Sequence, residues 1–289
     1  MPRIGIYYAF WEDRWQADYS RYIRKAAQLG LDILEIACTP IPAMSRTEMA
    51  RLRDEAAGLG VMLTAGHGPA AAQNLASPDP AVQRQAIAFY TDLLERLAFM
   101  NIRTIGGGIY SYWPVDYTQP IDKPGDWARS VQNVRTVGAI ADDLGIAYCL
   151  ESLNRFEGYL INTASEALQF VEEVGLDNVK VMLDTFHMNI EEDSFAGAIR
   201  LAGSRLGHFH IGETNRKPPG QGRMPWSEIA AALKEIGYQG SIVMEPFVKM
   251  GGQVGQDIRV WRDLSEGAAE SELDEAIRQS VAFCRQTFA

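Results

Sequence analysis

The sequence has few of the residues that build disulfide frameworks or cysteine-rich metal sites. It contains 3 cysteines among 289 residues, far apart and without a Cys-x-x-Cys pair. An odd number of widely spaced cysteines does not indicate a disulfide framework. Cys149 lies inside a predicted strand, where a free cysteine acts as a small buried hydrophobe. We therefore expect a protein of a reducing compartment.

Positive charge and long apolar runs are also scarce. Lys and Arg number 27 against 37 Asp and Glu, which gives a net charge of −10 and a pI near 5.0. Binding to a phosphate backbone depends on Lys and Arg, so a nucleic acid partner is disfavoured. The first residues lack the features of a signal peptide, and no apolar stretch approaches the length of a membrane span. We expect a cytoplasmic protein with no membrane partner.

Strand and helix patterns alternate along the whole chain. The expected strands are 4–8, 31–36, 61–65, 102–105, 146–151, 179–184, 206–210 and 241–245. The expected helices lie at 19–29, 45–58, 80–100, 126–144, 163–174, 194–202, 226–236 and 271–287. Eight such pairs fit a (β/α)8 barrel of ordinary length. The rival open sheet usually has a GxGxxG motif after its first strand, and this chain has none there. We predict a single (β/α)8 domain over residues 1–289, with an irregular excursion at about 246–269.

Four consecutive strands each end in a potential metal ligand: Glu151, Asp184, His210 and Glu245. Their spacings of 33, 26 and 35 residues correspond to one strand–helix unit each. The carboxyl ends of parallel barrel strands share one rim, so these side chains are expected to converge. One such residue alone is more often a helix cap or a solvated rim residue. Four at consecutive strand ends indicate a metal site.

An oxygen-rich site with one imidazole suits Mn²⁺, Co²⁺ or Mg²⁺ better than a structural zinc. Four protein ligands leave coordination positions for two neighbouring substrate oxygens, such as a ketone and the adjacent hydroxyl. The cation would then stabilise an enediolate formed by loss of the α-proton. Glu151 and Glu245 come from different strands, so one could remove a proton from one face while the other delivers a proton to the opposite face.

Other polar and aromatic residues near these strand ends carry weaker signals. Glu157, Arg155 and His187 become candidate substrate contacts only if the metal site exists. His208 was expected to point away from His210, into packing. The glycines at 106–108 indicate a phosphate-binding loop only weakly, because no Lys-Ser/Thr pair follows them. Aromatic residues near the first strand and near 113 are expected in packing or against a sugar ring, and the role of His67 is left open.

The motifs around these residues resemble the D-tagatose/D-allulose (psicose) 3-epimerase family. They are the runs 151–157, 179–193, 207–216, 222–226 and 244–247, together with Gly5-Ile-Tyr-Tyr8 and Ser111-Tyr-Trp-Pro114. The likeness extends from end to end. It implies a (β/α)8 barrel of the sugar isomerase/epimerase superfamily. Ser152 departs from the family pattern, where an apolar residue is expected, and His67 lies in a loop that varies among members.

The resemblance implies a role for each matching residue. Glu151, Asp184, His210 and Glu245 would bind Mn²⁺ or Co²⁺, with Mg²⁺ as a further option, and Glu151 and Glu245 would transfer protons. Glu157, His187 and Arg216 would hold the O1–O3 end of a free ketohexose, and Tyr7, Trp15, Gly66 and Trp113 would form the pocket wall. Members are typically homodimers or homotetramers, so we expect one of these assemblies.

The predicted function is therefore the interconversion of free ketohexoses at C3, such as D-fructose with D-allulose or D-tagatose with D-sorbose. The first alternative is an aldose–ketose or hydroxypyruvate-type isomerase on the same barrel. A second alternative is a barrel nuclease with several zinc ions. The chain has only 4 histidines to bind zinc, and its negative net charge disfavours binding of a phosphate backbone. A sugar-binding barrel with a structural metal is a third, although structural sites normally close their coordination shell.

Overall fold

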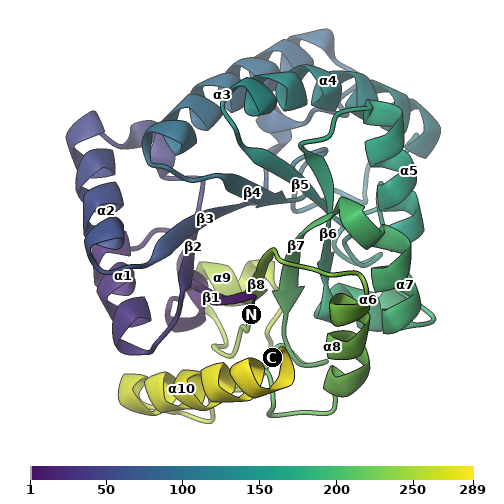
Figure 1. Cartoon of the computed structure of the whole chain (residues 1–289). Helices are drawn as coiled ribbons and strands as arrows, with labels where there is room; N and C mark the ends of the chain where they lie inside the picture. Colours follow the sequence, from purple (N-terminus) through teal and green to yellow (C-terminus); the bar gives the residue numbers. More distant parts are fainter. Residues whose placement is uncertain (1) are drawn as a thin grey trace.

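Eight parallel strands pair in chain order and close into a barrel. The computed structural model describes residues 2–289, so residue 1 of the expected domain lies outside the described residues. The last strand, β8, pairs with β1, which confirms the single (β/α)8 barrel (Figure 1). The strands are β1 (Arg3–Tyr7), β2 (Ile33–Ala37), β3 (Met62–His67), β4 (Thr104–Gly107), β5 (Ala147–Glu151), β6 (Val179–Asp184), β7 (Leu206–Ile211) and β8 (Ser241–Met244).

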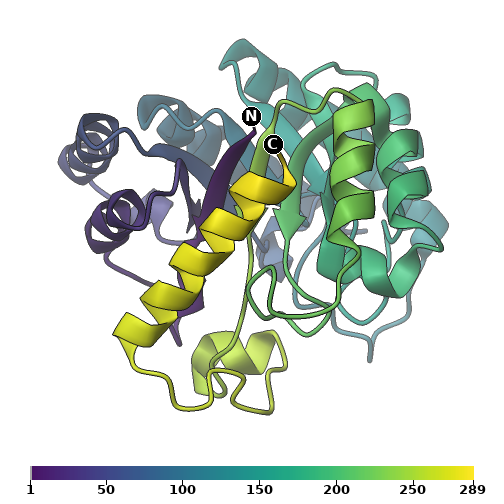
Figure 2. The ribbon, with the colours of Figure 1, turned by 60° about the horizontal axis from the view of Figure 1, so that its bottom comes forward.

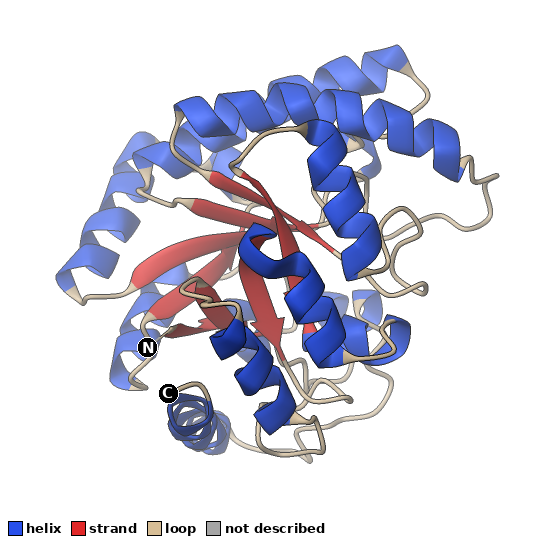
Figure 3. Ribbon diagram, turned by 45° about the vertical axis from the view of Figure 1, so that its right-hand side comes forward, coloured by secondary structure: helices blue, strands red, loops and turns tan. Residues whose placement is uncertain are grey.

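Helices form a ring around these strands, as Figure 3 shows. They are α1 (Tyr19–Gln28), α2 (Arg46–Gly58), α3 (Pro80–Phe99), α4 (Lys123–Asp143), α5 (Ala164–Val174), α6 (Thr185–Glu191), α7 (Phe195–Ala202), α8 (Trp226–Glu235), α9 (Gly252–Asp257) and α10 (Glu270–Thr287). Short 3₁₀ helices are η1 (Tyr8–Trp11), η2 (Ile41–Ala43), η3 (Ala71–Gln73) and η4 (Gly203–Arg205). Side chains cap the starts of α2 and α3: Ser45 and Glu48 form a capping box, and the Asp79 side chain accepts from the amide of Ala81.

The strands are short apolar runs because both of their faces are buried. One face packs inside the barrel and the other packs against the helices. All five residues of β2 are buried, as are all four of β8. A register shift between β6 and β7 leaves Gly207 out of the pairing. A Cβ at Gly207 would lie 2.5 Å from Cβ of Lys180, so only glycine fits at this close approach.

Some elements differ from the sequence predictions. Helix α4 begins at Lys123 rather than near Asp126, because the Asp122 side chain caps it by accepting from the amide of Gly125. Glu245 lies one residue beyond the end of β8. Helices α6 and α9 were not predicted. Asp184 both ends β6 and caps α6, so the chain turns directly from strand to helix at this point.

The region expected to be irregular, about 246–269, contains the short helix α9. In Figure 2, α9 lies beyond the end of the barrel that is opposite to the two termini. Ile258, Gln253 and Asp257 from this region line the main cavity, while Trp261 is 69% exposed. None of the helices within residues 2–289 is both long enough and apolar enough to span a membrane.

Candidate active site

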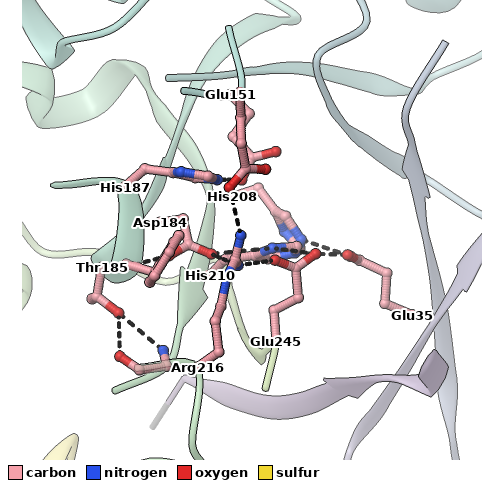
Figure 4. A network of polar contacts seen from close by, with 12 residues as sticks. Glu35, Glu151, Asp184, Thr185, His187, His208, His210, Arg216 and Glu245 are labelled. Atoms are coloured by element: carbon pink, nitrogen blue, oxygen red, sulfur yellow. Dashed lines mark hydrogen bonds and ion pairs between the residues drawn. The ribbon is translucent and has the colours of Figure 1, made fainter. Parts of the chain in front are cut away.

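The four residues at the ends of the last four strands converge as the sequence predicted. Glu151, Asp184, His210 and Glu245 each offer one ligand atom, and these atoms all lie within 4.8 Å of one another. His210 Nδ1 is 3.5 Å from Glu245 Oε1 and 3.8 Å from Asp184 Oδ2. Figure 4 shows Glu151 and Glu245 reaching this point from different sides.

The inward-facing atoms of this cluster fit a divalent cation. Glu151 Oε1, Asp184 Oδ2 and His210 Nδ1 are buried and have no hydrogen-bond partner among the described residues. Leaving such atoms unpaired is costly, and carboxylate oxygens with an imidazole nitrogen suit a hard or borderline metal ion. A cation bound between them would satisfy all three atoms. The cluster could therefore hold a divalent metal.

The electrostatics of the cluster are dominated by negative charge. Burial raises the pKa of Glu151 well above its ordinary value, and the charge of Glu245 raises it further. Burial lowers the pKa of His210, but the charges of Glu35 and Glu245 oppose this and leave the pKa raised overall. Three carboxylates facing one another favour any positive charge placed between them. A bound cation would lower the pKa of both Glu151 and His210.

Arg216 supplies part of that positive charge. Its Nη1 lies 2.9 Å from Glu245 Oε2, and its Nη2 lies 3.3 Å from Glu157 Oε1. The guanidinium carbon sits 3.8 Å from the centroid of the Phe186 ring, which holds the group in a stacked position. Arg216 itself has a φ of 66°, an uncommon value for a residue other than glycine. Its buried Nε has no hydrogen-bond partner within the described part of the chain and is free to donate to a ligand.

His187, on α6, is held with its free N–H toward the cluster. Its Nδ1 accepts from the backbone amide of Asn154 at 3.2 Å and lies 2.7 Å from Asn154 Nδ2. These two donors require Nδ1 to be unprotonated, so the hydrogen is on Nε2. Nε2 lies 3.7 Å from Glu151 Oε1. Burial lowers the pKa of His187, which favours this neutral, single-donor form.

The predicted wall residues surround the same cavity, which has a volume of about 880 Å³. Trp15 packs against Tyr7 and Trp113, with ring centroids 6.5 Å and 6.1 Å apart respectively. Trp15 Nε1 donates to Asp257 Oδ2 at 2.7 Å, which ties this wall to the segment after β8. A Cβ at Gly66 would lie 3.2 Å from Tyr7 Cε2, so a larger residue would narrow the cavity.

Two residues that the sequence left open lie outside the cluster. The His67 ring stacks on Phe89 of α3 at 5.5 Å, and its Nε2 contacts Gln73 Oε1 at 3.1 Å. Burial lowers the pKa of His67 to about 4, which keeps the ring neutral. The Ser152 hydroxyl donates to the carbonyl of Thr163 at 3.2 Å, so this side chain anchors the loop before α5.

The expectation for His208 was wrong. Residues two apart on a strand share a face, so His208 points into the barrel beside His210, with ring centroids 5.1 Å apart. Both rings meet a buried carboxylate, Glu35 on β2, at 2.7 Å (Figure 4). Sequence reasoning missed Glu35. The available signal was a single charged residue in the apolar run 33–37.

Comparison with known proteins gives close matches over the whole barrel. Residues 23–270 match the family described as xylose isomerase-like TIM barrel. The chain is 60% identical over 281 residues to D-psicose 3-epimerase of Ruminiclostridium cellulolyticum, covering 97% of this chain and 96% of that protein. It is 54% identical over 281 residues to D-psicose 3-epimerase of Agrobacterium fabrum, covering 97% of each.

Solved structures agree with these sequence matches. A crystal structure of D-psicose 3-epimerase with D-tagatose, from Clostridium cellulolyticum, superposes with a TM-score of 0.98 at 59% identity and covers 99% of each chain. A D-psicose 3-epimerase crystallised in the presence of D-fructose gives a TM-score of 0.98 at 53% identity, again over 99% of each chain.

Proposed function

The chain belongs to the D-tagatose/D-allulose (psicose) 3-epimerase family of xylose isomerase-like TIM barrels, and on that premise we propose that it interconverts free ketohexoses at C3. The substrate pairs are D-fructose with D-allulose (D-psicose) and D-tagatose with D-sorbose. One observation supports this most directly: Glu151, His210 and Glu245 of the cluster line the same cavity as the aromatic rings of Tyr7, Trp15 and Trp113. Sugar rings stack their C–H faces on such side chains.

Glu151, Asp184, His210 and Glu245 would hold one divalent cation per chain, Mn²⁺ or Co²⁺ in the first place and Mg²⁺ as a further option. When bound, the cation would polarise the C2 carbonyl of the sugar. The cluster fits this role because Glu151 Oε1, Asp184 Oδ2 and His210 Nδ1 are buried and lack hydrogen-bond partners among residues 2–289.

The two glutamates perform the proton transfers. One carboxylate takes the proton from C3, and the electron pair left behind is shared with the C2 carbonyl as an enediolate. The other glutamate, on the opposite side, gives its proton to the other face of C3, and the carbonyl re-forms. The result is an inverted C3, with one glutamate having gained the proton that the other has lost. In the reverse reaction the two glutamates exchange roles.

The remaining polar residues bind and orient the sugar. Arg216 and the Nε2–H of His187 present hydrogen-bond donors beside the cluster, and Glu157 accepts. We propose that these three side chains hold O1 to O3, so that C3 would lie between the two glutamates. Tyr7, Trp15 and Trp113 exclude water from one side of the sugar, and Gly66 leaves room for it. The active assembly is proposed to be a homodimer or homotetramer.

Solvent exchange tests the proposal. Turnover of D-fructose in D₂O should give D-allulose with deuterium at C3, detected by NMR. Product without deuterium at C3 would exclude proton transfer by exchangeable glutamates. Formation of an aldohexose in place of the C3 epimer would identify an aldose–ketose isomerase instead. Tight sugar binding with no turnover in the cation-loaded protein would indicate a binding protein.

A further inference from the structure

A carboxylate lies in the middle of the barrel interior, outside the set of residues that reach the cavity rim. Glu35 is on β2, and its exposed fraction is 0%. Its neighbours along the strand are apolar, and β2 lies across the barrel from β7, with which it does not pair. A buried charge of this kind needs several hydrogen-bond donors to be tolerated. The identity of those donors indicates what Glu35 does.

Three side chains donate to Glu35. Thr64 Oγ1 donates to Oε2 at 2.8 Å, His208 Nε2 lies 2.7 Å from the same oxygen, and His210 Nε2 lies 2.7 Å from Oε1. An ionised carboxylate only accepts hydrogen bonds, so both imidazoles carry a hydrogen on Nε2. Glu35 therefore fixes the position of that hydrogen on each ring, and it fixes the ring orientations as well.

The consequence for His210 concerns its second nitrogen. With Nε2 bonded to Glu35, Nδ1 faces Glu245 Oε1 at 3.5 Å and Asp184 Oδ2 at 3.8 Å. Resting on the proposed function, we infer that Glu35 is a positioning residue for the cation site. By bonding to Nε2, Glu35 keeps Nδ1 of His210 without a hydrogen and directed at the cation. Glu35 acts on the cation only through the ring of His210. Carboxylates that orient a metal-binding histidine in this way typically change metal affinity by about 10- to 100-fold.

Glu35, His208 and His210 also lie close enough together to suggest an ion site of their own. The hydrogen bonds argue against this reading. Both oxygens of Glu35 already have donors, whereas the inward-facing atoms of Glu151 and Asp184 have none among the described residues. The inference therefore requires one cation per chain and not two.

Glu35→Gln tests the inference with almost no change of shape. If the amide oxygen stays with Thr64 and His208, the NH₂ group faces His210 Nε2 and donates to it. The hydrogen of His210 must then move to Nδ1, where it blocks the cation. Thr64→Val is the matched control, because it removes one donor from the same carboxylate but leaves the bond from His210 Nε2 in place. Thr64→Val loses one buried hydrogen bond and Glu35→Gln reverses one, but only Glu35→Gln disturbs His210.

The measurement is calorimetric titration of the metal-stripped full-length chain with Mn²⁺, without sugar, beside thermal unfolding of each variant in EDTA. We expect one Mn²⁺ per chain in the parent and in Thr64→Val with similar Kd values, and a Kd at least about 10-fold higher in Glu35→Gln. The two variants should melt at similar temperatures in EDTA. A Kd of Glu35→Gln equal to that of Thr64→Val would overturn the inference, as would two ions per chain in the parent.

If Glu35→Gln does not fold, ¹⁵N-histidine NMR of the parent loaded with diamagnetic Zn²⁺ decides the matter. We expect hydrogens on Nε2 of both His208 and His210 and none on His210 Nδ1. A bare Nε2 on His210 would contradict the positioning role.

The calorimetric and NMR measurements do not involve turnover. A chain that binds Mn²⁺ as expected but epimerises no ketose would refute the proposed function and leave the role of Glu35 standing, whereas unchanged binding in Glu35→Gln would refute only the inference.

Discussion

The two halves of the barrel contribute different things to the site. Strands β5 to β8 each bring one candidate cation ligand to the rim, within one residue of the strand end. Strands β1 to β4 bring Tyr7 and Gly66 to the wall, and one carboxylate, Glu35, that stays below the rim. The second half thus carries the chemistry that we propose, and the first half shapes the cavity and orients one ligand from across the barrel.

This difference predicts separate outcomes for substitutions in the two halves. Changes in β5 to β8 should remove activity and leave the fold intact, because relief of repulsion among the carboxylates offsets lost contacts such as the ion pair of Glu245 with Arg216. Changes in β1 to β4 should alter substrate fit, stability or, at Glu35, cation affinity, and leave the two proton-transferring glutamates in place.

Glu245→Gln should have the largest effect. The amide does not take up a proton at C3, so kcat should fall by about 10³-fold or more. Thermal unfolding should change little, because the loss of the ion pair with Arg216 is offset by the loss of a charge that repels Glu151 and Asp184. Steady-state kinetics beside circular dichroism checks this. Glu191→Gln, which alters a carboxylate paired with the exposed Arg155, is the control and should retain activity. A Glu245→Gln enzyme with unchanged kcat would remove this residue from the mechanism.

Arg216→Lys should have the next largest effect. Lysine keeps the charge but loses the planar stack on Phe186 and the fork that reaches both Glu245 and Glu157. We expect kcat/KM to fall by about 100-fold, mainly through a higher KM, because two or more oriented donors to the sugar are lost. Arg155→Lys, at an exposed arginine that pairs with Glu191, should change kcat/KM less than about 2-fold. Equal kinetics for the two variants would place Arg216 outside the sugar site.

His67 should affect acid stability and not the chemistry. Its pKa falls from an ordinary value of 6.5 to about 4 in the folded protein because of burial. The unfolded chain therefore binds the proton first as pH falls, and the folded state loses stability between about pH 6.5 and 4. From pH 7.5 to 5 the loss is about 2 kcal/mol. Urea unfolding of the parent and of His67→Phe at both pH values measures it. A parallel pH dependence in the two proteins would contradict the prediction.

Gly66→Ala should have the smallest effect. The added methyl group would contact Tyr7 and Glu35 at 3.2 to 3.3 Å, so it should push the wall into the cavity and raise KM by about 3- to 10-fold. Gly58→Ala is the control, because a Cβ there meets nothing within 4 Å at the end of α2. That variant should be slightly more stable, with unchanged KM. An unchanged KM for Gly66→Ala would mean that the sugar does not reach this part of the wall.

The sequence revealed the four strand-end ligands of the second half but not the buried carboxylate of the first. Glu151, Asp184, His210 and Glu245 could be predicted because strand ends are visible as the last residue of an apolar run, and parallel strands bring those ends to one rim. Glu35 could not be placed in this way. It lies within its strand and not at the strand end. Its partners, His208 and His210, come 173 and 175 residues later in the chain. Only the closed barrel brings them together.

Local turns were the other limit. Helix α6 was missed because Asp184 serves at once as strand end and helix cap, so no loop residues separate the two elements. His187 was therefore noticed as a residue past a strand end, without the helix that aims its Nε2 at Glu151. The donors that set its tautomer come from Asn154, in a different loop. Cytoplasmic location and the oligomeric assembly stay predictions.

The most direct test of the central claim is the binding of a cation at the four strand ends. Calorimetric titration of the metal-stripped parent with Mn²⁺ should show one saturable site per chain, and the ion should raise the Tm. Asp184→Asn, which changes the one carboxylate ligand with no proposed part in proton transfer, should weaken binding strongly while the metal-free protein stays folded. Absence of saturable binding in the parent, or unaltered binding in Asp184→Asn, would contradict the account.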